Sequence, residues 1–81
     1  MDMINLTTVI ATALFEADRL RSQRLLTAAR ELDVVAENFA AGKAMPLHLK
    51  AASFDLMDAL PEESDLTTSE IIQAVRMALV S

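Results

Sequence analysis

The sequence contains no cysteine, tryptophan or tyrosine, and it has one glycine, two prolines and one histidine. Without cysteine it can form neither a disulfide framework nor a thiolate metal site. A phosphate-binding loop needs several glycines so that backbone N–H groups can converge on the anion, and Gly42 stands alone. His48 has no carboxylate three or four residues away on its expected helix, so we interpret it as an ordinary surface residue. We therefore expect no enzyme activity, no cofactor and no metal site.

The chain also lacks a long apolar run. Its longest uncharged stretch near the N-terminus, residues 3–15, is interrupted by asparagine and threonine, whereas a membrane span needs about 20 mostly apolar residues. The basic start of a secretory signal is missing too, because Asp2 is the first charged residue. We expect a cytoplasmic protein that does not associate with membranes.

The net charge of −5 is concentrated in one part of the chain. Residues 1–50 carry six acidic and six basic residues, whereas residues 51–81 carry six acidic residues against the single Arg76. Nucleic-acid binding draws on Lys and Arg at phosphates, so this acidic part disfavours contact with DNA or RNA. We expect no direct nucleic-acid binding.

Basic residues cluster only at Arg19, Arg21 and Arg24. Glu16 and Asp18 stand three residues before Arg19 and Arg21, a spacing that lets side chains pair on a helix. We interpret this cluster as an exposed salt-bridge face.

Helical periodicity predicts an all-α fold, a bundle of three to four helices in one domain over residues 1–81. Two apolar stripes precede the glycine: Leu6, Ile10, Ala13, Ala17 and Leu20, then Leu25, Ala29, Leu32, Ala36 and Phe39. The five-residue step from Leu20 to Leu25 turns the second stripe by about 140°. One bent helix and two helices, the second capped by Ser22, both fit this pattern. We favour two, because helices in globular proteins average about 11 to 12 residues.

Gly42 and Pro46 mark the next boundary. Glycine readily takes the left-handed conformation that ends a helix, and proline suits the first turn of the following one. We expect that helix over about residues 47–60, with Pro61 ending it. Its core face would be Leu49, Ala52, Leu56 and Leu60.

Thr67 and Glu70 have the spacing of a reciprocal capping box, and Leu66 and Ile71 occupy the positions of a hydrophobic staple. A last helix should therefore start at Thr67 or Thr68. Its expected core face is Ile71, Ile72, Val75, Ala78 and Leu79.

The acidic turn at residues 61–66 joins the last two expected helices as a helix-turn-helix-like pair. A DNA reader would present a basic first turn here, but this turn and the helix start after it are acidic. The same geometry with reversed charge suits the basic surface of a DNA-binding protein. We assign partner binding to five carboxylates and one neighbouring methionine: Asp55, Met57, Asp58, Glu62, Glu63 and Asp65.

The stretch RLLTAARELDVVAENFAAGKA at residues 24–44, followed by HLKAA at residues 48–52, resembles the centre of TraM-type quorum-sensing antiactivators. In these proteins a helix with a similar Arg-Leu and Glu-Leu pattern leads to an aromatic residue and a Gly-Lys/Gln-Ala turn. The chain is also similar in size to QseM-type antiactivators, and SFDLMDALPEESDLTTSEIIQAV fits their variant helix-turn-helix. The capped final helix departs from the two-long-helix TraM design.

These resemblances imply a small helical protein that binds a transcriptional activator and blocks its activity. We therefore expect an antiactivator in transcription regulation, with a protein partner. One alternative is a homo-oligomeric assembly module, such as a homodimer, that pairs through a spare apolar face of Leu25, Leu26 and Val34. A helix-turn-helix DNA-binding protein is the second alternative.

Overall fold

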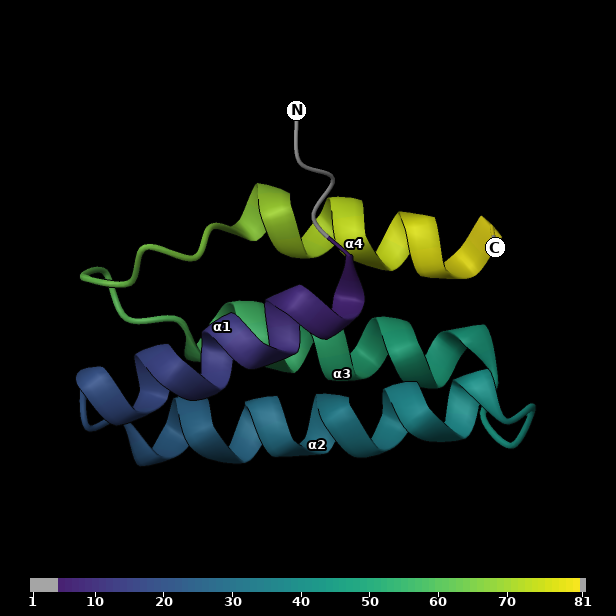
Figure 1. Cartoon of the computed structure of the whole chain (residues 1–81), viewed down its shortest axis with the longest axis horizontal. Helices are drawn as coiled ribbons and strands as arrows, with labels where there is room; N and C mark the ends of the chain where they lie inside the picture. Colours follow the sequence, from purple (N-terminus) through teal and green to yellow (C-terminus); the bar gives the residue numbers. More distant parts are fainter. Residues whose placement is uncertain (1–4, 81) are drawn as a thin grey trace.

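The computed structural model describes residues 5–80, and within them the chain forms four α-helices and no strand. The helices are α1 (Leu6–Arg19), α2 (Gln23–Ala40), α3 (Pro46–Ala59) and α4 (Thr68–Val80). Successive helices run in opposite directions, and α1 is tilted relative to the other three (Figure 1). The expected all-α bundle is confirmed.

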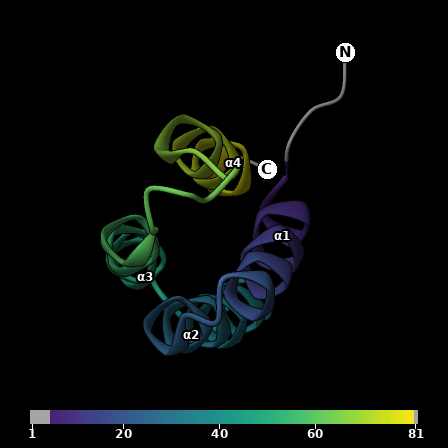
Figure 2. The same ribbon diagram turned by 90° about the vertical axis from the view of Figure 1, so that its left-hand side faces the viewer.

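Each helix packs against two neighbours. α1 contacts α2 and α4, and α3 likewise contacts α2 and α4. Viewed along the bundle, the helices surround a common centre, with α1 opposite α3 and α2 opposite α4 (Figure 2). The apolar stripes of all four helices meet there, and the largest fully buried apolar side chains are Leu25, Leu32, Leu49, Leu56, Ile71 and Val9.

Residues 20–22 separate α1 from α2, so the preference for two helices is confirmed. Arg21 takes a left-handed conformation with φ of 52°, and the N–H of Ser22 donates to the carbonyl of Ala17 at 2.9 Å. This is a Schellman closure, built here without glycine. The hydroxyl of Ser22 then accepts the N–H of Leu25 at 3.1 Å and caps α2.

Gly42 ends α2 in the same way. Its φ is 75°, and the N–H of Lys43 donates to the carbonyl of Asn38 at 2.7 Å. Pro46 is the first residue of α3, where its missing N–H costs no helical hydrogen bond. His48 supports this start, because its Nδ1 accepts the N–H of Met45 at 3.0 Å.

The capping box at the start of α4 is present. The N–H of Thr67 donates to Glu70 Oε1 at 3.0 Å, and the N–H of Glu70 donates to Thr67 Oγ1 at 3.2 Å. Leu66 and Ile71, on either side of this box, are both buried. The predicted start of the last helix is therefore confirmed.

Two expected apolar faces need correction. Ile72 is 38% exposed although Ile71 is fully buried, since adjacent residues on a helix point about 100° apart. Leu25 is also fully buried, whereas Val34 is 57% exposed. The proposed spare face of Leu25, Leu26 and Val34 is therefore not a continuous exposed surface. Among the helices described, none is both long and apolar enough to cross a bilayer.

Candidate protein-binding site

The structure distributes the six predicted partner-binding residues over three places. Asp55 and Asp58 are exposed on the side of α3 that faces α2, and Glu62, Glu63 and Asp65 are exposed in the loop between α3 and α4. Met57 is half-buried and faces a different groove, between α3 and α4. The acidic residues of the loop thus form one group, and the methionine does not belong to it.

A buried carboxylate holds the acidic loop in place. Glu16, on α1, is only 2% exposed. Its Oε1 accepts the backbone N–H of Asp65 at 2.6 Å and the hydroxyl of Ser64 at 3.1 Å. The Ser64 hydroxyl in turn accepts the N–H of Leu66 at 3.1 Å. The loop is therefore anchored through its backbone, while its acidic side chains stay exposed.

Arg19 completes this anchor. Its Nε donates to Glu16 Oε2 at 2.6 Å, and its Nη2 donates to Glu16 Oε1 at 3.0 Å. Nη2 also lies 3.3 Å from the carbonyl oxygen of Glu63 and 3.9 Å from Asp65 Oδ2. The prediction of an exposed salt-bridge face is wrong for Glu16. The prediction fails because the i, i+3 spacing indicates only that Glu16 and Arg19 pair on one helix. It does not indicate that the loop between α3 and α4 covers this pair.

The surroundings of Glu16 stabilise its charged form. The hydrogen bonds from Arg19, followed by the backbone N–H of Asp65, lower the pKa of the Glu16 carboxyl from 4.5 to about 2, although burial opposes this fall. The Ser64 hydroxyl adds to the lowering. The same pair raises the pKa of the Arg19 guanidinium. Glu16 is therefore ionised at neutral pH and serves as an acceptor for the loop.

The second group, Asp55 and Asp58, lines a shallow depression between α2 and α3. Asp58 Oδ2 is paired with Arg24 Nη2 at 2.5 Å, and both side chains are mostly exposed. Glu31 lines the same depression. Within residues 5–80, no group of three or more carboxylate or histidine side chains is arranged to hold a metal ion.

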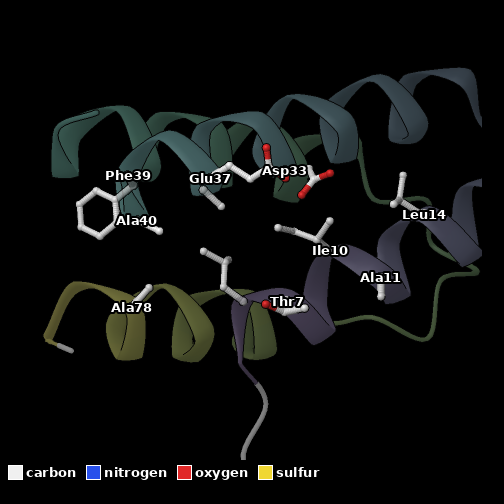
Figure 3. A pocket seen from close by; sticks show the side chains of 11 residues that line it. Thr7, Ile10, Ala11, Leu14, Asp33, Glu37, Phe39, Ala40 and Ala78 are labelled. Atoms are coloured by element: carbon white, nitrogen blue, oxygen red, sulfur yellow. The ribbon is translucent and has the colours of Figure 1, made fainter. Parts of the chain in front are cut away.

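A groove of about 880 Å³ opens between α1 and α2, with Ala78 of α4 at its border. The tilt of α1 separates its N-terminal half from the C-terminal half of α2 (Figure 3). Ile10 and Leu14 supply apolar walls, and Asp33 and Glu37 of α2 add carboxylates (Figure 3). The sequence did not predict this groove, because the apolar stripe of each helix was assigned to the core from its first residue to its last.

A smaller groove of about 350 Å³ lies between α3 and α4. Phe54, which is 65% exposed, and Ile72 stand at this groove together with Met57. Lys50 of α3 and Arg76 of α4 bring positive charge to it. The exposure of Phe54 and Ile72, on neighbouring helices, is the signal that reveals this surface. The sequence alone did not bring them together.

Comparison of the chain with protein-family models, with curated proteins and with solved structures finds no match.

Proposed function

We propose that this chain is a small cytoplasmic inhibitor that acts by protein contact, an antiactivator that binds a transcriptional activator through its acidic loop. The occupied partner surface would be basic, of the kind that otherwise contacts DNA phosphates. Binding there blocks the activator by competing with the nucleic acid. The resemblance of residues 24–52 to TraM-type antiactivators supports the same role.

The observation that carries this proposal is the anchored acidic loop. Glu62, Glu63 and Asp65 present three exposed carboxylates within four residues. The backbone that carries them is held by Glu16 through the N–H of Asp65 and the hydroxyl of Ser64. A surface whose conformation is fixed before binding loses less conformational entropy in the complex. Clustered charge of one sign also steers a basic partner towards the loop. Asp55 extends the negative surface along α3, where the neighbouring Asp58 is paired with Arg24.

The structure also bears on the two alternatives. Self-assembly through Leu25 is disfavoured, because its side chain is fully buried in the core. DNA binding by the last two helices would bring Glu62, Glu63 and Asp65 towards phosphates, and these carboxylates are exposed. Electrostatic repulsion therefore opposes a complex with a duplex.

The test uses a double charge reversal of the loop, Glu62→Lys with Glu63→Lys. The tagged chain and the variant are used to recover proteins from an extract of the native cell. A recovered activator is then purified, and its binding to its own DNA site is measured with increasing amounts of the chain. We expect the wild-type chain to displace DNA and the variant to do so at least about tenfold less effectively.

Asp33→Lys with Glu37→Lys is the matched control, because both residues are exposed on α2, away from the depression lined by Asp55 and Asp58, and the change in net charge is the same. If both double variants lose inhibition to the same extent, the net charge of the chain matters and the position of the charges in the loop does not. If the wild-type chain binds an activator without reducing its DNA binding, the antiactivator proposal is wrong.

A further inference from the structure

We propose that the groove between α3 and α4 is a second binding site, which takes an amphipathic helix with acidic residues on both sides of its apolar stripe. This proposal is independent of the acidic loop. It rests on the shape, polarity and charge of the groove.

The walls of the groove are two antiparallel helices (Figure 1). On α3, Phe54 and Met57 are three residues apart, and on α4 Ile72, Val75 and Leu79 follow at helical spacing. Apolar side chains therefore recur about once per turn along both walls. An amphipathic helix presents apolar anchors with the same repeat, which is how helices bind in grooves.

Among the described residues that line the groove, Ser53 is the one uncharged polar side chain. Ser53 is buried there, and its hydroxyl donates to the carbonyl of Leu49 at 2.7 Å. The O–H donor of Ser53 is thus used within α3. The groove contrasts with the larger one between α1 and α2, which contains Asp33 and Glu37. An apolar occupant fits the α3–α4 groove better than a polar one.

The charge at the groove determines the chemistry of the occupant's flanks. Lys50 and Arg76 are the only Lys or Arg residues between residues 46 and 80, and both line this groove, one on each wall. Neither forms an ion pair within residues 5–80, whereas Arg19 and Arg24 do. Within the part of the chain that the structure describes, no carboxylate lines the groove. A helix lying between the two walls would meet one cation on each side, so carboxylates on both flanks complement it.

A second copy of the chain is a poorer occupant. In a two-fold dimer the same patch faces itself, so the positively charged Lys50 and Arg76 of one copy would face the same positive patch on the other. Burying like charges together is unfavourable. The partner is therefore a helix of a different protein.

The test is a titration of the isotope-labelled full chain with a synthetic peptide of about 18 residues. Chemical shifts of the chain are measured by NMR at each step. Leucine recurs on the peptide at i, i+4, i+7 and i+11, with glutamate on both flanks. A second peptide has lysine in place of every glutamate. We expect shift changes confined to the groove residues. The glutamate peptide should bind about tenfold more tightly than the lysine peptide, because two ion pairs at the groove distinguish them.

Two variants locate the site. Phe54→Ala should weaken the binding of the glutamate peptide about tenfold or more, because it removes the most exposed apolar anchor. Lys50→Glu with Arg76→Glu should reverse the preference, so that the lysine peptide binds more tightly. The control, Arg30→Glu with Lys43→Glu, changes the net charge equally at exposed positions away from the groove and should leave the preference unchanged.

Three results would overturn the proposal. The first is no shift change at the groove, or shift changes centred on another surface. The second is equal binding of the two peptides. The third is self-association without peptide, seen by sedimentation and abolished by Phe54→Ala, which would assign the groove to a second copy. None of these results bears on the acidic loop, because the loop residues are unchanged in every variant.

Discussion

The backbone N–H of Asp65 donates a 2.6 Å hydrogen bond to the carboxylate of Glu16, 49 residues earlier in the chain. This bond ties the loop between α3 and α4 to α1. Because Arg19 contacts the same carboxylate and the carbonyl of Glu63, one ion pair holds the backbone of the acidic loop.

Removing the carboxylate should release the loop locally. In Glu16→Ala, we expect the amide hydrogen of Asp65 to exchange at least about tenfold faster than in the wild type, because its acceptor is gone. Amide exchange measured by NMR at neutral pH reports this directly. Glu31→Ala, at an exposed position on α2, is the control and should leave the exchange of Asp65 unchanged. Equal protection in wild type and Glu16→Ala would mean that other contacts hold the loop.

The same carboxylate makes stability depend on acid pH. The pKa of Glu16 is 4.5 as an unperturbed group and about 2 in the folded chain, so folding favours its ionised form. The contribution of the ionised Glu16 to the free energy of unfolding is complete above pH 4.5 and is lost as the pH falls from 4.5 towards about 2. The melting temperature should therefore fall across this interval more steeply in the wild type than in Glu16→Gln. The melting temperatures of the wild type and Glu16→Gln, measured by circular dichroism and plotted against pH, should converge near pH 2. Parallel curves would contradict the lowered pKa.

Truncation at two positions on α3 should change the free energy of unfolding by very different amounts. Leu56 is fully buried, and Leu56→Ala should lower the free energy of unfolding by about 2–5 kcal/mol. Phe54 is 65% exposed, and Phe54→Ala should change it by less than about 0.5 kcal/mol. Urea denaturation of both variants measures the difference. A large loss for Phe54→Ala would show that its ring supports the fold and is not available to a partner.

The two left-handed residues should respond with opposite signs. A Cβ at Gly42 would meet nothing within 4 Å, so Gly42→Ala should cost about 1 kcal/mol through backbone conformation alone. Arg21 already bears that strain with φ of 52°. Arg21→Gly should stabilise the chain by a few tenths to about 1 kcal/mol. Removing the Cβ relieves the strain of the left-handed conformation, and this gain exceeds the entropy cost of glycine. Urea denaturation of both variants tests this pair, and a loss of stability in Arg21→Gly would contradict it.

Local signals made most of the fold predictable. The cap at Ser22, the turn at Gly42 and the box formed by Thr67 and Glu70 each involve residues within about one helical turn, so they can be read from spacing. The closure of α1 at Arg21 gave no such signal, because glycine is the usual residue there. The five-residue step between the apolar residues Leu20 and Leu25, which breaks the helical spacing, was the indication that two helices were present.

The candidate surfaces were less predictable. The acidic loop was visible as composition, but its anchor was not, because Glu16 and Asp65 are brought together only when α1 and α4 pack. Met57 stood next to the acidic residues in sequence and yet faces another side of α3. Phe54 and Ile72 line one groove from two helices, and no periodicity within either helix reveals that pairing.

Contact between α1 and α4 also affects the order in which the fold can form. α4 packs against both α1 and α3, so the apolar surface of α1 and α3 that α4 covers stays open until residues 68–80 have been synthesised. An incomplete chain that stops before Thr68 would carry this surface uncovered and would be prone to associate with other chains. α4 thus covers apolar surface of α1 and α3 in the finished fold, in addition to forming one wall of a groove.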